Sequence, residues 1–180
     1  MNANFLNAAK IVLGVEGGLS DHPADKGGRT NLGVTQATLT RARKIIPGLP
    51  EKVDDLIQPQ ALSIYEVLYW NEAKCGEMPP PVDFLVFDAS INCGTGGGAK
   101  QLQRALNKMG ANIKVDGATG PLTLNALNTA FQSNPSRIVY LINVERVRWH
   151  NDIISRDKTQ LVFINGWLNR ILKNIDISGV

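Results

Sequence analysis

The first stretch of the chain places apolar residues at the spacing of one helix face. This series runs through Phe5, Ala9 and Val12, and its next member is Glu16. An apolar repeat of three and four positions is typical of an amphipathic helix, and the two glycines that follow Glu16 end it. The pattern therefore predicts a helix over residues 3–15 whose buried face continues to a carboxylic acid.

Most of the remaining chain shows the same helical period, interrupted by proline and glycine. Predicted helices cover residues 36–46, 51–57, 59–70, 82–91, 99–109, 135–154 and 159–173, and another has Pro121 in its first turn. Thr35 is the predicted N-cap of the helix that continues to Ile46. Residues 19–34 are rich in Asp, Pro and Gly and are predicted to form a loop, with a short hairpin as one option. The glycine-rich residues 92–98 are predicted to be a flexible joint. Because no long segment alternates with period two, the predicted fold is mainly α.

Size and composition are those of one globular domain, or of one domain with a small appended lobe. The chain has 180 residues, of which 43% are hydrophobic and 19% are charged. Its net charge of +3 is compatible with an anionic polymer such as a cell wall, but no basic run indicates nucleic acid. No stretch approaches the ~20 apolar residues of a membrane span. Residues 1–10 lack the pattern of a Sec signal peptide.

Other classes of chemistry lack the residues that they require. Cys75 and Cys93 have no metal-ligand spacing and either pair or stay free, and the only histidines are His22 and His150. We therefore expect no metal and no cofactor. Residues 94–99 fit a dinucleotide-binding fingerprint, but no βαβ pattern surrounds them. The G-x-S-x-G elbow of a serine hydrolase is also absent from the sequence.

The candidate catalytic residues lie in and beside the polar loop. Asp25 follows Glu16 by nine positions, and Thr30 follows Asp25 by five. Burial at the end of a helix would raise the pKa of Glu16 towards the range of a general acid, and a second carboxylate completes the pair that glycoside hydrolysis needs. Asp21 competes with Asp25 for that second role. Thr30 either positions a water molecule or hydrogen-bonds the turn.

The residues just described resemble the signature of glycoside hydrolase family 108. The match consists of Glu16-Gly-Gly, then Asp25-Lys-Gly-Gly-Arg-Thr30-Asn31-Leu-Gly-Val-Thr35, the helix ending in Tyr69-Trp70, the segment Asp88-Ala-Ser-Ile-Asn92-Cys-Gly94 and the tail Phe163–Arg170. The resemblance implies an N-acetylmuramidase of lysozyme-like fold, as found in phage endolysins and in secretion-associated bacterial muramidases. It also implies that Glu16 is the catalytic acid, and by analogy with phage-type lysozymes that Asp25 and Thr30 act with it.

A second resemblance covers residues 101–132, which are similar to the small helical peptidoglycan-binding repeat. Its residues include Val115-Asp116-Gly117 and Gly120-Pro121, which predict two tight turns between short helices. We expect a lysozyme-like catalytic part over residues 1–92 and a peptidoglycan-binding-like helical part over 93–180, packed as one unit. A helical lobe without a ligand of its own is an equally good interpretation of the second part.

Taken together, these features predict a monomeric peptidoglycan hydrolase that cleaves the β-1,4 bond between N-acetylmuramic acid and N-acetylglucosamine. The catalytic residues would be Glu16, Asp25 and Thr30, and the predicted substrate-binding residues are Asn31, Tyr69, Trp70 and Asn92. The aromatic pair lies at helical spacing, which is more typical of a core than of a sugar platform. The enzyme would be made in the bacterial cytoplasm and act on the cell wall after release or export, in phage lysis or protein secretion. A binding module without catalysis is the alternative, and a peptidase or amidase is a third option.

Overall fold

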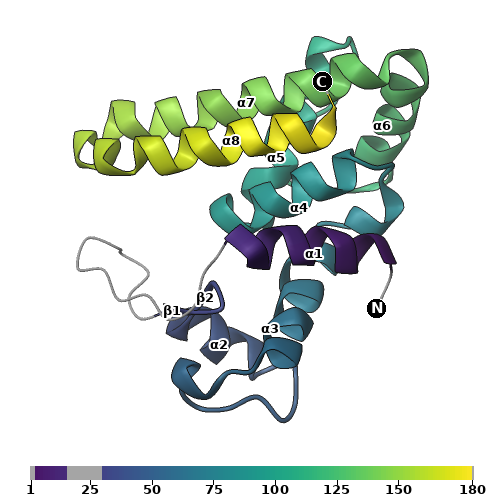
Figure 1. The fold of residues 1–180 in the computed structure, drawn as a ribbon. Coiled ribbons are helices and arrows are strands. Elements are labelled where there is room, and N and C mark those ends of the chain that lie inside the picture. Colours follow the sequence, from purple (N-terminus) through teal and green to yellow (C-terminus); the bar gives the residue numbers. More distant parts are fainter. Residues whose placement is uncertain (1–2, 16–29, 180) are drawn as a thin grey trace. The chain divides into compact units, whose positions relative to one another are not determined.

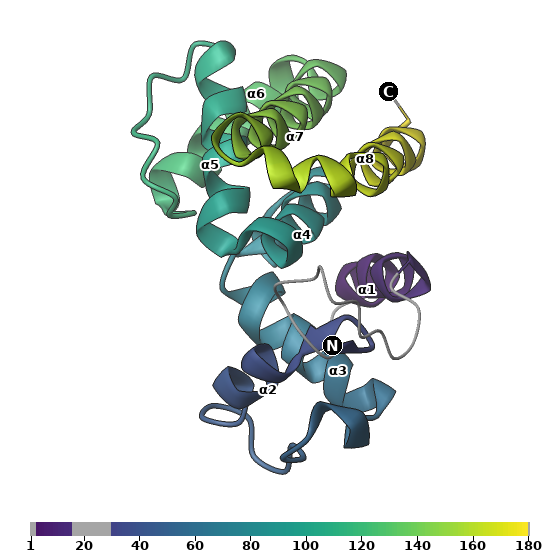
Figure 2. The same cartoon turned by 90° about the vertical axis from the view of Figure 1, so that its left-hand side faces the viewer.

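The structure, a computed structural model, describes residues 3–15 and 30–179 of the chain. They belong to two compact units, Met1–Glu72 and Ala73–Val180. Helices make up most of both units, and the strands of the described residues form one short hairpin (Figures 1 and 2). The fold is therefore mainly α, as the sequence predicts.

The first unit combines helices with the hairpin. Its elements are α1 (Ala3–Val15), β1 (Thr30–Asn31), β2 (Val34–Thr35), α2 (Gln36–Ala42), the short 3₁₀ helix η1 (Val53–Asp55), α3 (Gln58–Tyr65) and the π-helical segment η2 (Glu66–Asn71). On α1, Phe5 and Ala9 are fully buried and Val12 nearly so, which confirms the predicted apolar face. The ring of Phe5 meets that of Trp70 edge-on, with 5.6 Å between the ring centroids.

Helix α2 begins where the sequence predicts and ends earlier. The hydroxyl of Thr35 accepts a hydrogen bond from the backbone N–H of Thr38 at 3.1 Å, which is an N-cap. The helix ends at Ala42 instead of continuing to Ile46. Residues 43–46 form turns that still bond back to the helix, including one from the N–H of Ile46 to the carbonyl of Ala42 at 2.8 Å.

Helices are the only regular secondary structure among the described residues of the second unit. They are the 3₁₀ helix η3 (Cys75–Glu77), α4 (Val82–Cys93), α5 (Thr95–Lys108), α6 (Pro121–Ser133), α7 (Pro135–Arg156), the 3₁₀ helix η4 (Lys158–Phe163) and α8 (Ile164–Ser178). Helix α5 packs against α4, α6 and α7. The long helices α7 and α8 lie side by side (Figure 1). Pro121 and Pro135 both stand in the first turn of their helices, as predicted.

The predicted flexible joint over residues 92–98 is wrong. Only Gly94 separates α4 from α5, and its φ of 74° lets the chain turn between the two helices. The next glycines lie inside α5 and permit close packing against α4. A Cβ atom on Gly98 would lie 2.6 Å from the hydroxyl of Ser90, and one on Gly97 would lie 2.7 Å from the Cβ of Cys93. These glycines therefore set the distance between two helices.

A buried glutamine organises the turn between α5 and α6. The amide nitrogen of Gln103 donates to a carboxylate oxygen of Asp116 at 2.8 Å and to the carbonyl of Ala118 at 3.0 Å. Its amide oxygen accepts from the N–H of Gly117 at 2.9 Å. Gly117 has a φ of 85°, which favours glycine there. The tight turn predicted at Asp116-Gly117 is thus held by a side chain from α5.

The last helix differs from its predicted face. Of the positions expected on one apolar side, Ile171 is buried, whereas Leu161 and Leu168 are 48% and 43% exposed. Residues 158–163 form η4 before α8 begins, so Leu161 does not share the register of the helix. In the described part of the chain, no helix is both long and apolar enough to cross a membrane.

Candidate active site

The hairpin that begins at Thr30 is the described part of the predicted catalytic segment. Thr30 pairs with Thr35, and Asn31 pairs with Val34. The two residues between the strands, Leu32 and Gly33, have φ angles of 50° and 73°, and positive φ at both central positions is characteristic of a type I′ turn. A leucine in the left-handed region is uncommon and costs free energy. The surrounding structure must therefore hold this turn in place.

Asn31 supplies one of these restraints. Its side chain is buried, and its amide nitrogen lies 3.0 Å from the carbonyl oxygen of Val53, 3.3 Å from that of Asp54 and 3.1 Å from that of Leu56. The amide hydrogens thus donate to backbone carbonyl groups in η1 and just after it. This contact anchors β1 to the neighbouring loop, and the role of Asn31 in substrate binding stays a prediction.

Replacing Asn31 by Ala is expected to lower the free energy of unfolding by about 1–3 kcal/mol, because buried carbonyl groups lose their donor. Chemical denaturation of the full chain measures this loss. Asn71→Ala, at an exposed position of the same unit, is the matched control and should change stability little. Equal stability of the two variants would contradict the anchoring role.

Tyr65 supplies the second restraint on the turn. Its ring is buried at the end of α3, and its hydroxyl donates a hydrogen bond to the carbonyl of Leu32 at 2.9 Å. The chain then continues as the π-helical segment Glu66–Asn71, a conformation that is rare and often found at functional sites. Tyr65 therefore links the strained turn directly to the segment that carries the predicted aromatic site residues.

The two aromatic residues of that segment differ in accessibility. Tyr69 is partly exposed, and the guanidinium of Arg41 lies 5.7 Å from the centre of its ring. Trp70 is only 2% exposed and packs against Phe5. Of the two, Tyr69 has surface left for a ligand, whereas the contacts of Trp70 are those of a core residue. Both assignments to substrate binding stay predictions.

Glu16 and Asp25 lie outside the described residues. Glu16 follows directly on the last residue of α1, and Thr30, partly buried, begins β1. The described structure thus contains the helix that precedes the predicted catalytic segment and the hairpin that ends it, both in the same compact unit. Asn92 belongs to the second unit, where its exposed side chain donates to the backbone carbonyl of Asp88 at 2.8 Å.

A buried charged cluster in the second unit went unrecognised in the sequence. The carboxylate of Asp88 on α4 accepts from Arg146 on α7 at 2.8 Å and from Arg170 on α8 at 2.7 Å. Asn174 of α8 adds a third hydrogen bond at 2.8 Å. Asp88 and Arg146 are almost completely buried. The available signal was an aspartate within the strongly apolar segment 82–91, because a buried charge requires a partner.

Burial and the charges of the cluster shift the pKa values of Asp88 and His150. Burial alone would raise the pKa of Asp88, but the guanidinium groups of Arg146 and Arg170 and the amide of Asn174 hold it below its usual value. His150, one turn after Arg146, stacks on Trp167 with 4.5 Å between ring centroids. Burial, together with the positive charge of Arg146, lowers the pKa of His150 to about 4. At neutral pH Asp88 is therefore a carboxylate, and the imidazole of His150 is neutral.

The free energy of unfolding is expected to fall as the pH drops from about 6.5 to 4. In this window His150 takes up a proton in the unfolded chain, where its pKa is near 6.5, but stays neutral in the folded protein. Stability from this source is complete above the unfolded pKa and decreases towards the folded one. Urea unfolding between pH 4 and 8 measures it. His150→Phe should flatten the dependence, and an unchanged slope in that variant would contradict the assignment.

Comparison with known proteins identifies the family. Residues 9–94 match the family model described as Glycosyl hydrolase 108, and residues 98–172 match one described as Predicted Peptidoglycan domain. The solved structure of SagA from Brucella abortus is 30% identical to this chain, with a TM-score of 0.78, and the alignment covers 97% of this chain and 95% of that one. The chain belongs to the glycosyl hydrolase 108 family. No curated protein sequence matches it.

Membership of the glycosyl hydrolase 108 family confirms the resemblance inferred from the sequence and the lysozyme-like helical fold that it implies. The protein is a glycoside hydrolase that acts on cell-wall peptidoglycan. Both cysteines are free: Cys75 is buried, Cys93 is partly buried, and burial raises the pKa of each thiol. Within residues 3–15 and 30–179, no group of three or more His, Cys, Asp or Glu side chains is arranged to hold a metal ion.

The two family segments and the two compact units divide the chain at different places. The glycosyl hydrolase 108 segment extends to residue 94 and so includes α4, but α4 belongs to the compact unit Ala73–Val180. Through Asp88, this helix is joined to α7 and α8, both of which carry residues of the peptidoglycan-domain segment. The predicted division into residues 1–92 and 93–180 stays a prediction.

Proposed function

We propose that this member of the glycosyl hydrolase 108 family hydrolyses the β-1,4 bond between N-acetylmuramic acid and N-acetylglucosamine, with Glu16 as the general acid. Glu16 would protonate the leaving glycosidic oxygen while positive charge develops at the anomeric carbon. Asp25 would stabilise that charge or activate a water molecule that Thr30 helps to hold. Cleavage by water would leave a new reducing end on muramic acid.

The observation that carries this proposal is the anchored hairpin at the end of the predicted catalytic segment. Asn31 and Tyr65 hold it from two sides, through carbonyl groups near η1 and through Leu32. Thr30 is the first residue of this anchored strand, and Glu16 follows a helix whose apolar face is buried. Catalytic groups gain from rigid supporting elements of this kind because small misplacements are costly in rate.

Two aspartates, Asp21 and Asp25, lie in the predicted loop and compete for the role of second carboxylate. We assign the role to Asp25 by analogy with the order of acid, carboxylate and hydroxyl residues in phage-type lysozymes. Asp25→Asn and Asp21→Asn, each removing one negative charge, separate the two assignments when their initial rates on purified peptidoglycan are compared. A greater loss with Asp21→Asn would move the role to that residue.

Analysis of the released fragments tests the reaction. Purified sacculi are digested with the full chain, reduced with borohydride and examined by mass spectrometry. Reduced muramic acid ends are the expected result, because hydrolysis on the muramic acid side creates that reducing end. Reduced glucosamine ends would indicate a different glycosidic bond, and free peptides would indicate a peptidase or amidase. Anhydromuramic ends would show that the sugar's own hydroxyl, and not water, attacks the bond.

Binding of peptidoglycan without cleavage is the competing function. The match of residues 98–172 to a peptidoglycan domain supports this alternative. Sedimentation with purified sacculi and loss of turbidity, measured on the same preparation, distinguish the two. A protein that sediments with sacculi without clearing them would be a binding module.

Light scattering coupled to gel filtration tests the proposed monomer.

We place the activity in phage lysis or in protein secretion across the cell wall, after synthesis in the bacterial cytoplasm and release or export. Both settings need local cleavage of glycan strands. Neighbouring genes separate them, since a holin gene indicates lysis and secretion genes indicate export.

A further inference from the structure

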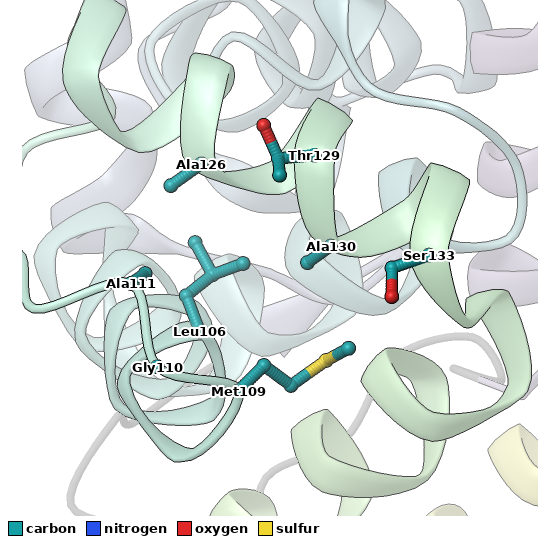
Figure 3. Close-up of a pocket in the computed structure, with 8 residues that line it drawn as sticks. All are labelled: Leu106, Met109, Gly110, Ala111, Ala126, Thr129, Ala130 and Ser133. Atoms are coloured by element: carbon teal, nitrogen blue, oxygen red, sulfur yellow. The ribbon is translucent and has the colours of Figure 1, made fainter.

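A pocket of about 310 Å³ opens between the end of α5 and the last turns of α6. Figure 3 shows Leu106 and Met109 on the α5 side and Ala126, Ala130 and Ser133 on the α6 side. Leu106 is fully buried and closes the base of the pocket, whereas Ser133 is exposed at its rim. Its volume lies at the lower end of the roughly 300–1,000 Å³ that is typical of ligand sites.

The lining restricts the chemistry of a ligand. None of the eight residues around the pocket is charged or aromatic. Thr129 donates its hydroxyl to the backbone carbonyl of Asn125 at 3.1 Å, and in Figure 3 this hydroxyl is turned away from Leu106 and Met109. Gly110 contributes main-chain atoms only. The pocket therefore offers methyl-lined walls, a serine hydroxyl and backbone polar groups.

The uncharged, methyl-lined walls of the pocket match the chemistry of one part of peptidoglycan. The lining has no aromatic ring on which a sugar could stack, and the acidic and cationic parts of the peptide stem would be left without an opposite charge. The junction of the lactyl ether of muramic acid with the first alanine of the stem carries two methyl groups and neutral amides. Methyl groups fit small apolar walls, and amides can bond the serine hydroxyl and the main chain.

We propose that this pocket binds the lactyl–alanyl junction that attaches the peptide stem to muramic acid. The inference rests on the proposed muramidase function for the identity of the polymer. It would make the residues between α5 and α6 the part of the chain that recognises glycan strands bearing stems, and it would separate peptidoglycan from polymers of N-acetylglucosamine, which have neither lactyl group nor peptide.

Methyl NMR on the full chain tests the proposal with muramyl dipeptide as the probe. This compound has one sugar and therefore no bond between sugars for the enzyme to cleave. The methyl signals of Met109, Ala126 and Ala130 are expected to shift on titration. N-acetylglucosamine at the same concentrations should leave them unchanged. Equal shifts with both compounds, or shifts confined to other residues, would overturn the proposal.

A pocket-filling variant provides the matched comparison. Ala126→Leu adds side-chain volume inside the pocket and should weaken binding of muramyl dipeptide at least about tenfold, which corresponds to ~1.4 kcal/mol. Asn128→Leu adds the same side chain at an exposed position of α6 outside the lining and should bind like the wild type. If Ala126→Leu does not fold, Ser133→Leu at the exposed rim takes its place. Wild-type affinity in the folded pocket variant would refute the assignment.

The outcome is separable from that of the proposed function. A protein that releases fragments with reducing muramic acid ends but does not bind muramyl dipeptide would retain its function and lose this site. Binding at the pocket, combined with fragments that lack those ends, would support the site and overturn the reaction.

Discussion

Glu16→Gln is expected to lower the initial rate of peptidoglycan lysis about 10²–10⁴-fold, the contribution of a positioned general acid. Glutamine keeps the size of the side chain but has no proton of suitable acidity for the leaving oxygen. Turbidity of a sacculus suspension measures the rate. Because the change removes one charge and little volume, thermal unfolding of the variant should resemble that of the wild type.

Glu51→Gln is the matched control for this experiment. Glu51 belongs to the same unit, and its mostly exposed carboxylate pairs with Arg43 at 3.3 Å. Exposed ion pairs contribute little to stability, so this variant should keep both its fold and its activity. Lysis by a folded Glu16→Gln protein at a rate near that of Glu51→Gln would remove Glu16 from the mechanism.

Asp88→Ala is expected to destabilise the second unit by about 3–5 kcal/mol, the usual cost of removing one partner from a buried ion pair. The variant would leave the buried guanidinium of Arg146 without its carboxylate partner and would remove the shared acceptor of α7 and α8. Denaturant unfolding followed by tryptophan fluorescence measures the loss, since two of the three tryptophans, at positions 149 and 167, lie in the second unit.

Asp152→Ala serves as the control for Asp88, since it removes the same group from an exposed position on α7. Its stability should stay close to that of the wild type. The contrast should also depend on pH. The lowered pKa of Asp88 means that its stabilising effect is complete above the unfolded pKa of about 3.9 and is lost as the pH falls below it. Similar unfolding curves for the two variants would show that the cluster is dispensable.

Local patterns predicted the helices well where burial follows the helical period. The face of α1, the N-cap at Thr35 and the prolines that open α6 and α7 all follow from residue types and spacing. The failures have tertiary causes. The glycines at 96–98 favoured a joint, but they lie in α5, where α4 approaches Gly97 and Gly98 too closely for a side chain. No local signal distinguishes these two uses of glycine.

The candidate site shows the same division. The sequence pointed to the loop before Thr30 and to the family, and the family is confirmed. It did not indicate that the amide of Asn31 serves backbone carbonyl groups 22 to 25 positions away, or that Tyr65 bonds Leu32 from 33 positions away. Such pairings depend on how distant segments fold together. For the same reason, Asp88 could not be matched in advance with Arg146 and Arg170.

The position of α4 has a practical consequence for building hybrid enzymes. A hybrid joined at the boundary between the two family segments would be cut between residues 94 and 98. That cut would separate Asp88 from the two arginines that neutralise it, and a foreign segment would have to supply both. A junction at Glu72–Ala73 would transfer α4 together with α7 and α8. Asp88 and the two arginines would then come from the same parent protein.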